Sequence, residues 1–159
     1  MSYNPEIHHR RSIRLQGYDY TNVGIYFVTI CSYQRQHLFG TIDNGEMKIN
    51  LAGQIVFTLW QKIPQHFPNV QLDEFVLMPD HLHGIVVIAE SKDKFSLANI
   101  IQNFKSVSSR KINRINKNYG VSIWQRNYYE RIVRNEEELN NQREYIKSNP
   151  ANRVYLNTE

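Results

Sequence analysis

Two strand-like segments joined by a two-residue link constrain the fold of this chain more than any other feature. Residues 70–78 alternate apolar and polar side chains, and residues 81–88 end in the apolar run 85–88 (IVVI). Pro79 and Asp80 between them are typical turn residues. Because parallel strands need a crossover of a dozen or more residues, so short a link predicts an antiparallel hairpin.

Three other segments have strand character. Their β-branched and aromatic residues favour a pleated, half-buried surface, and the turn signal at 43–45 (DNG) precedes one of them. These segments are 24–30, 47–49 and 128–133.

Three segments are predicted to be helices from apolar spacing and capping residues. Their N-caps are Asn50, Ser96 and Asn135, and their ends are placed at Pro64 with Pro68, at Tyr119 with Gly120, and at Pro150. The order strand, strand, helix, strand, strand, helix, strand, helix predicts an α+β fold, in which helices pack on a mainly antiparallel sheet.

Composition supports one globular domain over residues 1–159. The chain is 41% hydrophobic and has no apolar run of the roughly 20 residues that span a bilayer. No secretory signal precedes the domain, so we expect a cytoplasmic protein without membrane contact. The single Cys31 excludes an intramolecular disulfide and a multi-cysteine zinc site, and it is expected to be a small buried side chain.

The positive charge is concentrated in two places. The net charge is +4 and the pI about 9.2, which favours a polyanionic partner without proving one. One cluster is a basic N-terminal arm over about residues 1–17, and the other lies on the second predicted helix; a solvated helix face is the alternative interpretation of the second. Together they contain Arg10, Arg11 and Arg14, and Lys105, Arg110, Lys111, Arg114 and Lys117.

His81 and His83 are the candidate metal ligands. Side chains two apart in a strand point to the same face, so both imidazoles could reach one ion, whereas Leu82 should face the core. A pair of plain surface histidines is the alternative. A histidine-triad nucleotide hydrolase would need a third histidine at position 85, where this chain has Ile85.

Tyr145 and Asn149 are four residues apart on the last predicted helix, so they share one face of it. A phenol and an amide oxygen could thus meet at one site. Most tyrosines, however, are core or surface residues, and this chain has ten.

Four blocks of the chain resemble a known family. Residues 75–84 (FVLMPDHLHG) are similar to the His-hydrophobe-His (HUH) signature of single-tyrosine transposases, in particular the REP-associated tyrosine transposases. Residues 124–130, residues 143–150 and an early block, 14–20 followed by 24–29, are also similar to that family and occur in its order. The resemblance implies a ferredoxin-like HUH nuclease fold.

The resemblance also implies a mechanism. His81 and His83 would hold Mg²⁺ or Mn²⁺, Tyr145 would be the nucleophile, and Asn149 would be a third ligand, although the following Pro150 also makes Asn149 a candidate helix terminator. Attack on single-stranded DNA beside a hairpin would give a 5′-phosphotyrosine and a free 3′-OH. A retained hairpin-binding protein with little or no strand transfer is the alternative. The oligomeric state is open, with a homodimer slightly favoured over a monomer.

Candidate DNA contacts complete the hypothesis. Arg131 stands where many relatives would carry a histidine, and it could contact a phosphate instead or be a plain surface arginine. Tyr18, Tyr20 and Trp124 could stack on bases, although a place in the core is the favoured interpretation for each of them. The candidates for phosphate contacts are Arg10, Arg11, Arg14, Lys105, Arg110, Arg114, Arg126 and Arg131.

Overall fold

The computed structural model describes the backbone of residues 23–92 and 95–158 and the side chains of 23–92 and 95–149. The predicted basic arm, with Arg10, Arg11 and Arg14, and the candidate stacking residues Tyr18 and Tyr20 lie outside the described residues. The elements are, in chain order, β1 (Gly24–Cys31), the 3₁₀ turn η1 (Tyr33–Arg35), β2 (Gly40–Asp43), β3 (Glu46–Ile49), α2 (Leu51–Gln61), α3 (Ile63–His66), β4 (Val70–Met78), β5 (His81–Ile88), α4 (Leu97–Asn116), β6 (Tyr129–Val133) and α5 (Glu136–Thr158).

The main sheet has the strand order β4-β5-β1-β6, and each neighbouring pair is antiparallel. The predicted hairpin of β4 and β5 is confirmed, with Met78 opposite His81 at the turn. β2 and β3 form a separate two-stranded ribbon. The predicted α+β class with a mainly antiparallel sheet is therefore correct.

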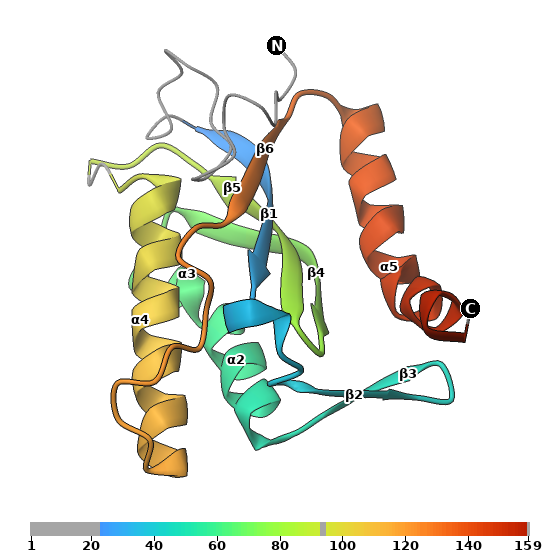
Figure 1. The fold of residues 1–159 in the computed structure, drawn as a ribbon. Helices are drawn as coiled ribbons and strands as arrows, with labels where there is room; N and C mark the ends of the chain where they lie inside the picture. The colour runs from blue at the N-terminus through green and yellow to red at the C-terminus, as the bar shows by residue number, and fades with distance from the viewer. Residues whose placement is uncertain (1–22, 93–94, 159) are drawn as a thin grey trace.

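The two faces of the sheet are covered by different helices. Figure 1 shows α2 and α4 on one side and α5 on the other. Leu82 belongs to the core under α2 and α4, as its strand alternation predicts, together with Tyr26 and Val28. Phe27 and Ile85 lie on the opposite face, where they form a smaller cluster with Val133 and Ile146.

The three predicted helix starts are confirmed by their capping hydrogen bonds. Asn50 Oδ1 accepts from the Gly53 amide at 2.9 Å, and Asn135 Oδ1 accepts from the Glu138 amide at 2.8 Å. Ser96 forms a reciprocal capping box with Asn99. Local side-chain chemistry thus fixes where each helix begins.

The predicted helix ends are less accurate. α2 ends at Gln61 and α3 begins at Ile63, with Pro64 in its first turn. α4 ends at Asn116, and its C-cap Lys117 adopts a left-handed φ of 57° before Gly120 is reached. The prediction that Pro150 stops the last helix is wrong, because α5 continues to Thr158. A helix can contain proline when it gives up one main-chain hydrogen bond and bends.

The loop between β1 and β2 packs against the β4–β5 turn. The Ser32 amide donates to the Asp80 carbonyl at 2.9 Å, and the Phe39 amide donates to the Pro79 carbonyl at 3.1 Å. Gln34 and Arg35 both have φ of 54°, in the left-handed region that non-glycine residues seldom adopt. This turn brings the Arg35 guanidinium to the carboxylate of Asp80.

Candidate active site

His81, His83 and Tyr145 lie together on the α5 face of the sheet. The imidazole centroids of His81 and His83 are 4.5 Å apart, and the Tyr145 ring centroid is 5.3 Å from that of His83. Phe27 stacks on His83 with centroids 5.5 Å apart. The structure thus brings the two predicted ligands and the predicted nucleophile to one place.

Both histidine rings are held through Nδ1. His81 Nδ1 lies 2.7 Å from Asp80 Oδ1, and the other oxygen of Asp80 accepts from Arg35 Nε at 3.2 Å. His83 Nδ1 lies 2.8 Å from Thr29 Oγ1 on the neighbouring strand. A carboxylate on Nδ1 favours the tautomer whose Nε2 lone pair is available, which is the form in which histidine binds a metal.

His83 is neutral at physiological pH. Burial, assisted by the nearby charges of His81 and Arg35 and opposed by Asp80, lowers its pKa from 6.5 to about 3. A buried, uncharged imidazole needs no deprotonation before it coordinates an ion.

Tyr145 is accessible, whereas the histidines are not. The residue is 45% exposed, against 7% for each of His81 and His83. The tyrosine and His83 line an open pocket together with Thr29, Tyr129 and Arg131. An incoming strand could reach the phenol without rearrangement of the core.

Asn149 is on the same side of α5 and is 8% exposed, but its Nδ2 has no hydrogen-bond partner among the described residues. β5 and β6 point the same way because each is antiparallel to β1, and α5 returns along the sheet from the end of β6 (Figure 1). Four helical residues advance about 6 Å and two strand residues about 7 Å. The path from Tyr145 to Asn149 along α5 therefore has about the same length and direction as the path from His83 to His81 along β5.

Few described side chains near the two histidines could serve as further metal ligands. No cluster of three or more His, Cys, Asp or Glu side chains suited to a metal ion occurs among residues 23–92 and 95–149, whose side chains the structure describes. A third protein ligand from the described residues would have to be an amide or hydroxyl oxygen, and the buried side-chain amide of Asn149 carries such an oxygen, although the atom without a partner is its Nδ2, a donor that does not bind a cation.

Comparison with known proteins decides the family. The sequence profile described as "Transposase IS200 like" matches residues 19–149, most of the chain. The chain belongs to this family. Membership identifies it as a transposase-like protein that processes DNA.

Two curated relatives of this IS200-like chain come from Haemophilus influenzae. An uncharacterized protein is 43% identical over 170 residues, which cover 93% of the chain and 92% of the relative. A protein named as a candidate REP-associated tyrosine transposase is 26% identical over 144 residues, which cover 87% of the chain and 76% of the relative.

Two solved structures share the fold of the IS200-like chain. The REP-associated tyrosine transposase bound to a REP hairpin superposes with a TM-score of 0.65 at 20% identity, over 88% of this chain and 73% of that one. A candidate transposase from Deinococcus radiodurans superposes with a TM-score of 0.52 at 14% identity, over 86% and 96%.

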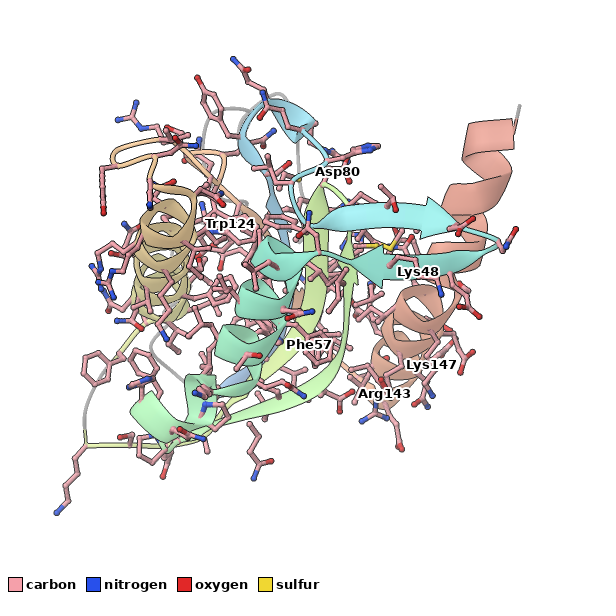
Figure 2. All side chains as sticks on the ribbon, turned by 90° about the horizontal axis from the view of Figure 1, so that it is seen from below. Lys48, Phe57, Asp80, Trp124, Arg143 and Lys147 are labelled. Atoms are coloured by element: carbon pink, nitrogen blue, oxygen red, sulfur yellow. The ribbon has the colours of Figure 1, made fainter. Side chains whose placement is uncertain are left out.

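The predicted DNA contacts are divided between the two sides of the sheet. Arg131 lines the Tyr145 pocket, and its Nε donates to Glu138 on α5 at 2.9 Å. Arg110 and Arg114 are exposed on α4, which covers the opposite face, and Arg126 lines an open groove beside α4. Figure 2 shows Trp124 on the α4 side and Arg143 on the α5 side.

Lys105 and Trp124 occupy structural positions. Lys105 is buried, and its Nζ donates to the main-chain carbonyls of Gln125 at 2.8 Å and Asn127 at 3.1 Å; burial lowers its pKa to about 8. Trp124 is 7% exposed and donates through Nε1 to Ser108 at 2.9 Å. These contacts bind the loop before β6 to α4, so we exclude both residues from the proposed DNA surface.

Sequence reasoning missed the residues that orient the histidines. Asp80 directly precedes His81, so a carboxylate next to a candidate ligand was a usable signal. Thr29 and Phe27 reach His83 only through the pairing of β1 with β5, which no local pattern reveals. Cys31 was expected to be buried but is partly exposed at the end of β1, opposite His81.

No helix within the described residues is both long and apolar enough to cross a membrane.

Proposed function

We propose that this IS200-like chain is a metal-dependent single-stranded DNA endonuclease and strand transferase that acts beside DNA hairpins. The observation that carries the proposal is the placement of Tyr145 with its ring centroid 5.3 Å from that of His83, within the same chain. The relative whose structure was solved with a REP hairpin supports the class of DNA.

Tyr145 would act as nucleophile. Its phenolic oxygen attacks the scissile phosphorus, the bond to the 3′-oxygen breaks, and a proton passes to that oxygen to give a free 3′-OH. The product is a 5′-phosphotyrosine, which keeps a phosphodiester bond for a later joining step without ATP. The 45% exposure of Tyr145 suits a group that must meet a polymer substrate.

His81 and His83, through Nε2, and Asn149, through its amide oxygen, would hold a divalent ion. Bound there, Mg²⁺ or Mn²⁺ neutralises charge on the scissile phosphate. Because Mg²⁺ prefers an all-oxygen shell, a mixed nitrogen and oxygen set makes Mn²⁺ the better probe.

The exposed cations would hold the DNA backbone. Arg131 borders the Tyr145 pocket and is the best placed to meet the phosphate being cut. Arg110, Arg114 and Arg126 lie on the α4 side, where they would contact DNA away from the reacting phosphate. Arg10, Arg11 and Arg14 remain candidates on sequence grounds alone.

A covalent-adduct assay tests the proposal. The purified protein is incubated with labelled single-stranded hairpin oligonucleotides and Mn²⁺ and then resolved on a denaturing gel. We expect an adduct that disappears with EDTA and in Tyr145→Phe. The matched control is Tyr129→Phe, because Tyr129 lines the same pocket, and this variant should keep the adduct.

Two outcomes would contradict the proposal. If Tyr129→Phe loses the adduct and Tyr145→Phe keeps it, the nucleophile is wrong. Tight hairpin binding with no adduct across varied hairpins would instead support a DNA-binding protein without strand transfer.

A further inference from the structure

The attachment of α5 determines where Tyr145 can act. Only Arg134 and Asn135 separate β6 from α5, and the apolar cluster beneath the helix is small, with Ile146 its buried contribution from α5. A short link fixes where the helix starts, and apolar contact has no direction, so neither sets the helix axis.

A directional contact is supplied by a bulge in β4. The register between β4 and β5 shifts between Leu72 and Phe75, so β4 carries an extra residue there. Asp73, within the bulge, accepts two hydrogen bonds from Arg143 on α5: Nε to Oδ1 at 2.8 Å and Nη2 to Oδ2 at 2.7 Å. A bidentate pair of this kind fixes orientation as well as distance.

The surroundings reinforce this pair. Arg143 Nη1 also donates to Asn140 on its own helix at 3.1 Å, and the hydrogen bonds from Arg143 hold the pKa of Asp73 below its usual value. Lys147, one turn further on, is 3.9 Å from Glu74 in the same bulge, but both side chains are more exposed. Figure 2 shows Arg143 and Lys147 on α5.

Arg143 stands seven residues after the start of α5, about 10 Å along its axis, and two residues before Tyr145. The link to β6 and the Asp73–Arg143 ion pair therefore hold the helix at two separated points. Two points define its direction, which in turn sets how near the Tyr145 ring lies to His83.

We propose that the Asp73–Arg143 ion pair fixes α5 on the sheet of its own chain, so that Tyr145 acts with His81 and His83 of that same chain. Asp73 and Arg143 are positioning residues, since they touch neither histidine. The part of this inference that concerns catalysis by Tyr145 rests on the proposed function, but the docking of α5 on the sheet can be measured independently of that function.

The first test mixes two inactive proteins of different size, Tyr145→Phe and His83→Ala. If the tyrosine serves its own chain, neither protein forms an adduct in the mixture. An adduct on the His83→Ala protein, at a rate near that of wild type, would overturn the inference because the tyrosine would then act on the histidines of another copy.

The second test compares Arg143→Ala with Lys147→Ala by hydrogen exchange of the α5 amides and by the rate of adduct formation. Arg143→Ala should speed exchange and slow the adduct about tenfold, because small displacements of a reacting group cost much of its rate. Lys147→Ala should change neither measurably.

A double-mutant cycle with Asp73→Ala completes the test. The second substitution should add nothing to the first. Unchanged exchange and rate in Arg143→Ala, or additive effects of the two substitutions, would refute the ion pair as the positioning contact. If wild type forms no adduct at all, the proposed function fails, and the exchange data alone judge the docking of α5.

Discussion

The two faces of the β4-β5-β1-β6 sheet bury different numbers of apolar side chains. Among the residues that the structure describes, twenty buried side chains form one core under α2 and α4, whereas four form the cluster under α5. The rest of the α5 face is occupied by His81, His83 and the groups that hold them. One face thus supplies most of the stability, and the other carries the polar side chains that chemistry requires.

The two faces meet in adjacent residues of β5. Leu82 is fully buried in the larger core, and its neighbours in sequence are the two histidines. A strand alternates its side chains between the faces, so stability and chemistry can be changed separately by substitutions one residue apart.

The sharpest prediction compares His83→Ala with Leu82→Ala. His83→Ala should abolish the adduct and weaken Mn²⁺ binding, while the metal-free protein stays folded. Leu82→Ala should lower the free energy of unfolding by about 2–5 kcal/mol, because it leaves a cavity in the larger core. Urea denaturation measures the stability of each variant, and the adduct assay measures its activity. If His83→Ala lost more stability than Leu82→Ala, the assignment of stability to one face and chemistry to the other would be wrong.

Trp124 tests whether an aromatic side chain on the α4 side serves the core or the DNA. Trp124→Ala should cost about 3–5 kcal/mol of stability, whereas Trp124→Phe should lose only about 1 kcal/mol with the hydrogen bond to Ser108. Thermal denaturation gives both values. If Trp124→Phe remains stable but binds single-stranded DNA much more weakly, Trp124 stacks on DNA bases and its exclusion from the DNA surface is wrong.

Asp80 tests the support of the metal site on the other face. Asp80→Asn keeps the shape but removes the carboxylate that holds His81 Nδ1. We expect Mn²⁺ affinity to fall by about 10–100-fold, as is typical for residues that orient a metal ligand. Titration calorimetry measures it; an unchanged affinity would show that His81 needs no carboxylate partner.

Acid should loosen α5 before it unfolds the larger core. The pKa of Asp73 lies below its usual 3.8 because Arg143 bonds to its charged form. The stabilising contribution of the pair is therefore complete above about pH 4 and is lost as the pH falls through the lower value of the folded state. Hydrogen exchange of α5 across this range should follow that loss in wild type, with no such step in Asp73→Asn.

The smallest expected effect separates exposed from buried cations on α4. Arg110→Gln and Arg114→Gln should each lower the salt dependence of hairpin binding by about one unit of the log–log slope. Lys105→Met should leave that slope unchanged, because its Nζ is already bonded to carbonyls of the loop before β6. Binding isotherms at several salt concentrations distinguish the two classes, and a slope change in Lys105→Met would contradict our assignment.

The sequence by itself determined most of the elements and the identity of the proposed chemical groups, although strand β2 (Gly40–Asp43) was not predicted. Apolar alternation and a two-residue turn specify the β4–β5 hairpin, and side-chain caps specify the starts of α2, α4 and α5, because these signals act within a few residues. The resemblance at residues 75–84 and 143–150 pointed to the histidines and to Tyr145.

Only the tertiary structure decided how those groups are held. Thr29 and Arg35 reach the histidine site from a neighbouring strand and from a loop. Asp73 contacts Arg143, seventy residues away in sequence. Lys105 is buried by a loop that follows it in the chain. Such contacts depend on strand register and on a bulge, which arise when distant segments pack and therefore leave no short-range pattern. The pairing of the His83 imidazole with Thr29, and the side of the sheet on which each cation lies, follow from packing alone.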